Sequence, residues 1–316
     1  MRVLHWHVHG AWSTAFVHGD HEHLIPVAPD RGPEGRGRAQ TYAWPDNAVE
    51  VTKEELGDTD VDVVVLQRPE ELDGLAREWL GGRVPGKDVP AVYVEHNAPQ
   101  GRVNDLRHPA ADRDDLLLVH VTHFNDLFWD AGSTETTVVD HGIVDPGHRY
   151  TGELPRAAVV VNEARRRARV TGTDLLPRLN GTVPLDLFGM DAASAGEHVT
   201  PIDDLPHAQL HQEMARRRVY LHPIRWTSLG LALLEAMHLG MPVVALATTE
   251  VPMAVPPSAG VVSTDVRELR AGLARLVADR DEARERGTAA RAAALERYGL
   301  GRFLADWDAL LERVAR

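Results

Sequence analysis

The sequence contains no cysteine, few lysines and no long apolar run, and each shortage excludes a class of site or protein. Without cysteine the chain forms no disulfide, no thiolate zinc site and no thiol nucleophile. Arginine supplies every basic residue except Lys53 and Lys87, so few side chains are available for Schiff-base chemistry. The apolar runs are far shorter than the ~20 residues needed to cross a bilayer.

Positive charge is also in short supply. The formal net charge of -13 argues against broad binding to nucleic acids or to anionic membranes, because both attract basic surfaces. Residues 1–7 lack the continuous apolar core of a secretion signal. We therefore expect a cytoplasmic protein with no nucleic-acid partner and no stable membrane association.

Short β-branched runs alternate with helical patterns along most of the chain. Several runs, such as residues 61–66, are apolar without alternation, as expected of strands covered on both faces. The alternation of strands and helices predicts an α/β fold with parallel, doubly wound sheets. Strands are predicted at residues 3–8, 61–66, 91–95, 116–121, 137–139, 157–161, 185–188, 219–221, 243–245 and 260–262. Helices are predicted at residues 70–80, 123–130, 174–179, 207–217, 229–239 and 265–278.

The length of 316 residues suggests two domains of about 150 residues each. The polar, Pro- and Gly-containing stretch 145–152 is the best place for a boundary. We predict Rossmann-like domains at residues 1–148 and 149–300. Residues 301–316 form an amphipathic helix that must dock its apolar face on other elements. That face consists of Phe303, Trp307, Leu310, Leu311 and Val314.

The most informative segment is residues 225–245, RWTSLGLALLEAMHLGMPVVA. Thr227 or Ser228 could cap the N-terminus of the helix predicted here. Gly240 lies where a left-handed residue commonly ends a helix. The segment is therefore predicted to form one complete helix followed by an apolar strand.

Apolar side chains cover every face of that helix except at Glu235 and His238, so the helix should be buried. A carboxylate in such a place needs either a protein partner or a ligand whose hydroxyls donate to it. The helix N-terminus, with Gly230 allowing close approach, is a natural seat for a phosphate.

Segment 225–245 resembles the signature of the retaining GT-B glycosyltransferases of family four, which are common in bacteria. That signature has two glutamates separated by seven residues, followed by Ala-Met, Gly and Pro-Val-Val-Ala. Other similar stretches spread the resemblance over most of the chain. They are HGIVD at 141–145, TGTDLL at 171–176, YLHP at 220–223, and YG at 298–299 before the terminal helix.

The resemblance implies two facing Rossmann-like domains, the GT-B fold, with the last helix crossing back to the first domain. The first domain would bind the acceptor and the second the nucleotide sugar. Glu235 matches the second signature glutamate, which is expected to bind the ribose hydroxyls of the donor. The donor phosphates are expected to be held by the backbone of Ser228, Leu229, Gly230 and Leu231.

Two residues of the first domain also match the family. His96, at a predicted strand end, matches a histidine that faces the transferred sugar, and Gly10 matches a loop glycine that closes over the diphosphate. Structural roles are the alternatives at each position. His96 could be a hydrogen-bonded strand-end histidine, Glu235 a paired structural carboxylate, and the arginines of 165–169 a solvated surface.

The sequence departs from the family at two positions. Thr227 replaces the first signature glutamate, which is expected to contact sugar hydroxyls, so the resemblance fixes neither the donor sugar nor full turnover. Thr171 occupies the usual position of a phosphate-binding lysine, and arginines crowd the residues before it. Arginine binds phosphate bidentately and stays charged. We therefore assign the clamp to Arg166 and Arg169, with Arg165 beside them.

The implied activity is metal-independent transfer of a sugar, with retention of configuration, from a nucleotide diphosphate donor. UDP is favoured over GDP as the base, no cofactor is required, and the acceptor is expected to be a soluble small molecule or saccharide. A non-catalytic sugar-nucleotide-binding protein is one alternative, since Thr227 and the missing lysine could mark a degenerate site. A GT-B sugar-nucleotide epimerase is the other.

Two metal-binding patterns compete with this interpretation. His5, His7 and His9 alternate and would share one face of the first strand, where imidazoles are common metal ligands. Such histidines more often have structural roles, so no metal site is predicted. The Asp-x-Asp triplets at 60–62 and 112–114 match metal-dependent transferases only in a short and common pattern.

Overall fold

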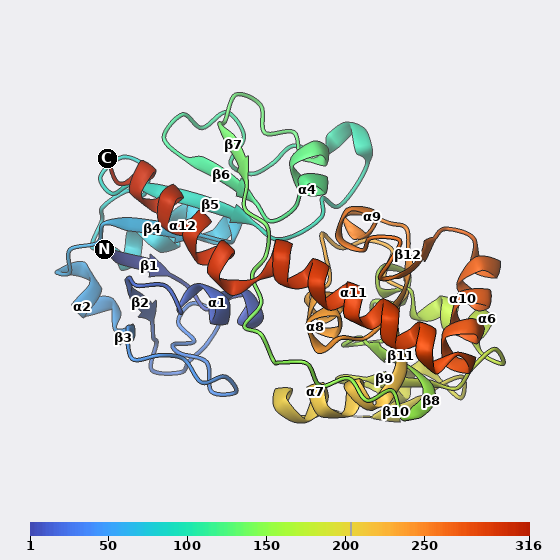
Figure 1. Ribbon diagram of the computed structural model, residues 1–316. Coiled ribbons are helices and arrows are strands. Elements are labelled where there is room, and N and C mark those ends of the chain that lie inside the picture. Colours follow the sequence, from blue (N-terminus) through green and yellow to red (C-terminus); the bar gives the residue numbers. More distant parts are fainter. Residues whose placement is uncertain (203) are drawn as a thin grey trace. The chain divides into compact units, whose positions relative to one another are not determined.

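A computed structural model describes residues 1–202 and 204–316 of the chain. The chain divides into two compact units, Met1–Val144 with Leu300–Arg316, and Asp145–Gly299 (Figure 1). The first unit thus ends at Val144, whereas the sequence prediction places the boundary at residue 148. In the described parts, no helix is both long and apolar enough to span a bilayer.

The first unit contains a seven-stranded sheet in the order β3-β2-β1-β4-β5-β6-β7, and all neighbouring strands are parallel. Two of its central strands, at residues 63–66 and 91–95, are buried at every position, because helices cover both faces. The strands are β1 (Arg2–His5), β2 (Glu22–Pro26), β3 (Ala48–Val51), β4 (Val63–Leu66), β5 (Ala91–Glu95), β6 (Leu117–His120) and β7 (Thr136–Val138).

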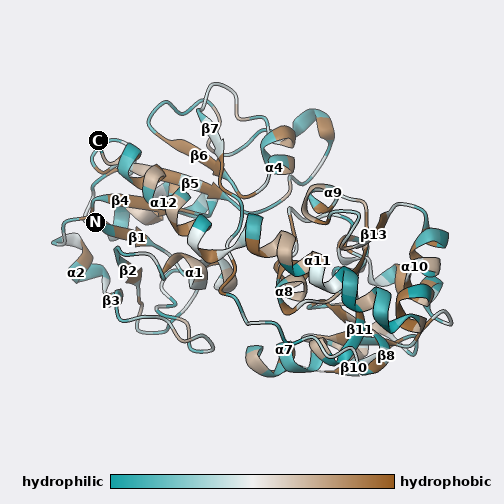
Figure 2. Ribbon diagram, viewed as in Figure 1, coloured by the Kyte–Doolittle hydropathy of each residue, from teal (hydrophilic) through white to brown (hydrophobic). Residues whose placement is uncertain are grey.

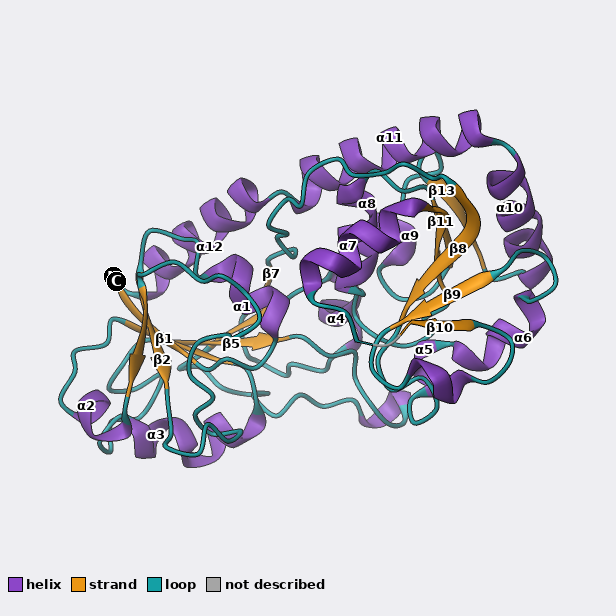
Figure 3. Ribbon diagram, turned by 90° about the horizontal axis from the view of Figure 1, so that it is seen from below, coloured by secondary structure: helices purple, strands orange, loops and turns teal. Residues whose placement is uncertain are grey.

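Two pairs of helices cover this sheet. The helical segments are α1 (Gly10–Phe16), α2 (Lys53–Gly57), η1 (Glu71–Leu75), α3 (Ala76–Trp79), η2 (Val103–Asp105), α4 (His123–Phe128) and α12 (Leu300–Val314). Side chains alternate between the faces of a strand. Val63 and Val65 therefore face α1 and α12, whereas Val64 and Leu66 face α2 and α3 (Figure 3).

The terminal helix α12 is an integral part of the first unit, as its apolar face predicts. Phe303, Trp307 and Leu311 are buried completely or nearly so. The Trp307 ring packs edge-on against Trp12 and Phe16 of α1, with ring centroids 5.6 and 5.1 Å apart. Although α12 follows the second unit in sequence, its core contacts are with strands and helices from the start of the chain.

The second unit contains a six-stranded parallel sheet in the order β10-β9-β8-β11-β12-β13. Strands such as β5 are hydrophobic along most of their length, whereas the long helix α11 (Arg280–Tyr298) is largely hydrophilic (Figure 2). The strands are β8 (Leu154–Val160), β9 (Leu185–Phe188), β10 (Thr200–Ile202), β11 (Arg217–His222), β12 (Val243–Leu246) and β13 (Gly260–Ser263).

Helices enclose this second sheet as well. On one face, Leu269, Leu273 and Leu276 of α10 pack over the strands. The helix α8 packs against both α7 and α11, which leaves nearly all of its side chains buried. The remaining helical segments are α5 (Ala168–Thr171), η3 (Thr173–Leu175), α6 (Leu176–Leu179), η4 (Ala192–Ala195), α7 (His207–Arg216), α8 (Leu231–Leu239), α9 (Val251–Ala254) and α10 (Val266–Ala278).

The predicted α/β class with parallel sheets is confirmed, but several elements differ. The sequence patterns missed strands β2, β3 and β10, which are short, polar or contain proline. They also missed the helices α1, α2 and α11. The predicted helix at 70–80 is broken, because Gly74 adopts φ 135° inside η1, before α3 begins.

The first unit buries histidines in its apolar core. His5 and His23 are 0% exposed, and their ring centroids lie 5.3 Å apart beside Phe16 of α1. Burial lowers the pKa of His5 to about 3 and that of His23 to about 2, because the charged imidazolium loses its hydration. Both rings are therefore neutral in the native protein at pH 7.

This burial predicts loss of stability in mild acid. The unfolded chain takes up protons on these histidines below pH 6.5 while the native chain does not, so the free energy of unfolding falls as pH drops. Each buried histidine contributes a slope of about 1.4 kcal/mol per pH unit between pH 6.5 and its native pKa. Urea titrations at pH 7, 6 and 5 should show a smaller slope for His5→Leu than for wild type. The exposed His198→Leu is the control, and equal slopes for all three proteins would contradict the prediction.

Candidate functional site

The sheet of the second unit changes direction of winding between β8 and β11. β9 and β10 follow on one side of β8, while β11, β12 and β13 follow on the other. In open parallel sheets, ligands bind at the carboxyl ends of the strands at such a switch point. The segments that leave this point are residues 161–172 after β8 and 223–230 after β11.

These two segments are joined by their backbones. The carbonyl of Val170 accepts hydrogen bonds from the amides of Arg225 and Trp226 at 2.8 and 3.2 Å. Gly172 adopts φ 76°, and a Cβ at this position would lie 1.7 Å from the carbonyl oxygen of Pro223. Only glycine fits here, and the arginine-rich segment is thereby fixed against the entry to α8.

Helix α8 begins and ends at glycines. Gly240 adopts the left-handed conformation predicted for it, with φ 87°. The predicted cap was wrong, because the N-cap residue is Gly230 and neither Thr227 nor Ser228 caps the helix by a side chain. The helix also starts two residues later than predicted, at Leu231. Its first amide groups therefore stay available to an anion.

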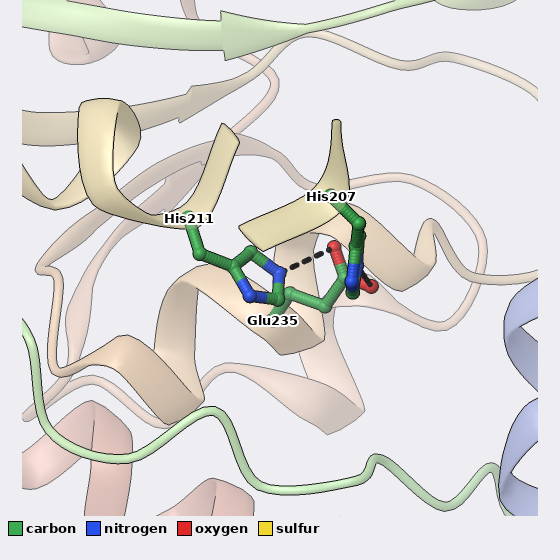
Figure 4. Close-up of side chains that lie close together, drawn as sticks. All are labelled: His207, His211 and Glu235. Carbon is green, nitrogen blue, oxygen red and sulfur yellow. Dashed lines mark hydrogen bonds and ion pairs between the residues drawn. The ribbon is translucent and has the colours of Figure 1, made fainter. Parts of the chain in front are cut away.

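Glu235 is the buried carboxylate of α8, with 7% of its surface exposed. Its partners come from α7, where His207 Nε2 lies 3.0 Å from Oε1 and His211 Nε2 lies 3.4 Å from Oε2 (Figure 4). Burial alone would raise the carboxyl pKa, but the hydrogen bond and ion pair with the two histidines outweigh it and lower the pKa to about 2. Glu235 is therefore ionised at neutral pH.

The predicted arginine clamp lies on the surface of the loop after β8. Arg166 pairs with Glu163 at 2.8 Å, and Arg169 pairs with Asp174 at 3.0 Å. Their side chains are 68% and 79% exposed. Arg165 is exposed too, and its side chain makes no hydrogen bond or ion pair with the described residues. Exposed pairs of this kind are weak and can exchange partners with an incoming phosphate.

The other predicted residues of this unit lie along one short path into α8. Thr227 is half-buried, Ser228 and Leu229 are buried, and Leu231 opens the helix. The structure thus brings the phosphate-binding candidates to one end of α8, with the Glu235 carboxylate farther along the same helix.

In the first unit, His96 follows β5 at the carboxyl edge of the sheet. Its Nε2 lies 3.1 Å from the Gln67 side-chain oxygen, and its ring centroid lies 4.0 Å from that of His9. Burial, together with the neighbouring His9 and His141, lowers the His96 pKa well below its usual value. Gly10 is the first residue of α1, immediately after His9. His96 and Gly10 thus lie at the strand ends of their own unit, as the sequence predicts.

The metal patterns considered in the sequence do not form in space. β1 ends at His5, so His7 and His9 leave the strand. The His7 ring packs at a tilt against Trp44, with centroids 4.8 Å apart, and the His9 ring packs against His96. The Asp-x-Asp residues hold local structure instead. Asp62 accepts the backbone amide of Arg2 at 2.7 Å, and Asp112 accepts that of Ser133 at 2.9 Å.

The residues that the sequence analysis overlooked are His207 and His211. They are four residues apart in the helix predicted at 207–217, a spacing that places both on one helix face. The four-residue spacing is visible in the sequence. It does not reveal the partner, because Glu235 is distant in sequence. Among the residues that the structure describes, these three form the one group whose ligand atoms could together hold a metal ion.

Comparison with known proteins identifies the fold and the domain. Residues 189–293 match the family described as Glycosyl transferases group 1. The whole chain superposes on sucrose-phosphate synthase from Thermosynechococcus elongatus with a TM-score of 0.71 and 14% identity, covering 99% of this chain and 98% of that one. The chain has the GT-B fold, and residues 189–293 form a domain of the glycosyl transferases group 1 type. The matched domain contains the entry to α8 and all three residues of the Glu235 cluster.

Other solved structures resemble this chain. Anabaena HepE, determined in complex with UDP, superposes with a TM-score of 0.70 and 14% identity over 99% of this chain and 100% of that one. The pneumococcal O-GlcNAc transferase GtfA, in complex with UDP and GlcNAc, has a TM-score of 0.57 and 13% identity. That match covers 80% of this chain but 56% of GtfA. A search of curated proteins by sequence finds no significant match.

The close contact at Gly172 predicts a site-specific cost of adding a methyl group. Gly172→Ala places a residue with a Cβ at positive φ and drives that carbon into the Pro223 carbonyl. Gly181→Ala is the matched control, because Gly181 has φ 79° but nothing within 4 Å of its Cβ position. We expect the control to cost about 1 kcal/mol of unfolding free energy, and Gly172→Ala distinctly more. Urea denaturation measures both, and equal losses would show that the two segments can separate.

Proposed function

We propose that the protein transfers a sugar from a UDP-sugar to a soluble small-molecule or saccharide acceptor, with retention of anomeric configuration. The observation that carries this proposal is the ionised Glu235 carboxylate in α8, whose N-terminus opens at the switch point of a glycosyl transferases group 1 domain. UDP is proposed as the nucleotide because HepE and GtfA were determined in complex with UDP.

The donor would occupy the carboxyl end of the second sheet. Glu235 would accept hydrogen bonds from the ribose hydroxyls, taking the place of one or both histidine contacts. The backbone amides of residues 228–231 would bind the diphosphate at the helix N-terminus, where the helix dipole favours negative charge. Arg166 and Arg169, assisted by Arg165, would close over the same phosphates and leave their surface carboxylate partners.

The chemistry then needs no protein nucleophile. Cleavage of the anomeric C–O bond leaves its electron pair on the diphosphate oxygen and makes the sugar oxocarbenium-like. The arginines and helix amides stabilise the leaving diphosphate as its charge develops. The acceptor hydroxyl attacks from the same face and passes its proton to the leaving phosphate oxygen. His96 would face the transferred sugar, and the Gly10 loop the diphosphate. No metal ion is required by these steps.

Two alternatives keep a sugar-nucleotide site but change the outcome. A non-catalytic binder is favoured by Thr227, which is short and neutral where a glutamate is expected, and by Thr171 in place of lysine. A sugar-nucleotide epimerase would use the same donor site and release the altered nucleotide sugar. Slow hydrolysis of the donor separates an enzyme from a binder, and free epimerised nucleotide sugar identifies the epimerase.

Thermal denaturation with UDP, GDP and ADP tests the nucleotide. A ligand present at 100 times its dissociation constant adds about 2.7 kcal/mol to the free energy of unfolding. We expect UDP to stabilise the protein most and donor turnover to persist in EDTA. Stabilisation by none of the three nucleotides would contradict the proposed donor class. Loss of turnover in EDTA, restored by manganese, would contradict metal independence.

The role of Glu235 is tested by Glu235→Ala. The fold should survive, because α8 is otherwise apolar and alanine favours a helix. Affinity for UDP should fall by about 10- to 100-fold, since a hydrogen bond to a charged group contributes about 1.5–3 kcal/mol. Isothermal titration calorimetry measures the change, with Gln212→Ala, an exposed residue of α7, as the control. Unchanged affinity in Glu235→Ala would make the carboxylate purely structural.

Thr227 is the position where this chain leaves the family signature. If threonine reflects a changed donor, Thr227→Glu should shift the preference among UDP-sugars and leave UDP affinity nearly constant, because glutamate restores a charged acceptor for a sugar hydroxyl. If the protein is a degenerate binder, the same substitution should create or greatly raise transfer without changing selectivity. Turnover of a panel of sugar nucleotides distinguishes these outcomes, and identical profiles and rates would place Thr227 outside the sugar pocket.

A further inference from the structure

The cluster around Glu235 contains more metal-ligating chemistry than a ribose-binding carboxylate needs. His207 and His211 project from successive turns of α7, and Glu235 projects toward them from α8 (Figure 4). The three ligand atoms all lie within 4.8 Å of one another, and the two nitrogen–oxygen distances to Glu235 are 3.0 and 3.4 Å.

The two nitrogen–oxygen separations are close to those around a tetrahedral ion. Zinc binds histidine nitrogen and carboxylate oxygen at about 2.0–2.2 Å, which puts neighbouring ligand atoms roughly 3.3 Å apart. Only small side-chain movements would bring all three atoms onto one ion. Two histidines one helical turn apart are also a recurrent zinc-binding arrangement, and two histidines with one glutamate leave a fourth position open.

The burial of the cluster points to a ligand as well. The His211 side chain is 6% exposed, and its Nε2 lies 3.4 Å from Glu235 Oε2 in an ion pair but forms no hydrogen bond with any part of the chain that the structure describes. Buried nitrogens are normally satisfied. An ion between His211 and Glu235 would satisfy this nitrogen. The His207 side chain is 31% exposed, which leaves a route for an ion from solvent.

We propose that His207, His211 and Glu235 bind a divalent transition metal of the zinc class, and that the bound metal blocks the donor nucleotide. Two imidazoles with one carboxylate suit zinc, whereas magnesium and calcium prefer oxygen ligands throughout. The second part rests on the proposed function, because it requires Glu235 to hold the donor ribose. The metal and the ribose hydroxyls compete for the same carboxylate oxygens.

Calorimetric titration with zinc chloride, on protein stripped with EDTA and dialysed, tests the site directly. We expect one zinc ion per chain at this site, and at least 10-fold weaker binding in His207→Gln and in His211→Gln. The exposed His198→Gln should bind zinc as wild type does, and magnesium chloride should give no comparable binding. Thermal denaturation in EDTA verifies that each variant is folded. Absence of zinc binding, or equal binding in all four proteins, overturns the metal site.

Titration with UDP tests the competition. In wild type, one equivalent of zinc per chain should raise the apparent dissociation constant for UDP at least 10-fold relative to EDTA. In His211→Gln the same zinc concentration should change it little, which also controls for zinc complexes of free UDP. UDP binding that is unchanged or strengthened by zinc in wild type overturns the competition. Absence of UDP binding in EDTA overturns the proposed donor, and the direct zinc titration still decides the metal site.

Discussion

An ionised carboxylate in an apolar helix is the constraint on which the second unit depends. Helix α8 is packed between α7 and α11 and buries almost every side chain it carries. Glu235 cannot be charged in such a place without partners, because the loss of hydration would cost many kcal/mol. The register of α7 against α8 supplies those partners by bringing two histidines to within 3.4 Å of the carboxylate. The packing of α7, α8 and α11 therefore also fixes the partners of the Glu235 carboxylate.

The topology of the sheet decides where that helix begins. Both segments that carry the candidate phosphate ligands leave the carboxyl ends of β8 and β11, the adjacent strands at which the winding reverses. The hydrogen bonds to Val170 and the close approach at Gly172 tie these segments together. A diphosphate at this point would meet helix amides from one segment and guanidinium groups from the other. No long-range rearrangement is needed to create that environment.

The comparisons show how far sequence can change while the fold persists. Solved structures with 14% identity superpose over nearly the whole chain. The parallel sheets require apolar strands, and helices whose apolar residues recur with the helical period. Many different sequences meet these two requirements. The site is more demanding, and it is there that this chain differs from the family signature, with Thr227 for a glutamate and Thr171 for a lysine. Function belongs to such positions rather than to the fold.

The sequence by itself determined the α/β class, the parallel sheets, the apolar face of the terminal helix and the need of Glu235 for a partner. These follow from local rules: apolar runs mark strands covered on both faces, a 3.6-residue period marks the buried face of α12, and a lone carboxylate in an apolar helix demands a partner. Strands such as β2, β3 and β10 are too short to show a clear hydrophobic pattern. They are stabilised by pairing with neighbouring strands of the sheet.

Only the tertiary structure decided what surrounds each charged group. It separated His5, His7 and His9, whose alternation suggested a shared face, because β1 ends at His5. It paired Arg166 and Arg169 with Glu163 and Asp174, and it brought His207 and His211 to Glu235 across 24 residues or more of chain. Sequence periodicity describes neighbours along one element. Contacts between elements depend on the packing of whole helices and sheets, and no local pattern records them.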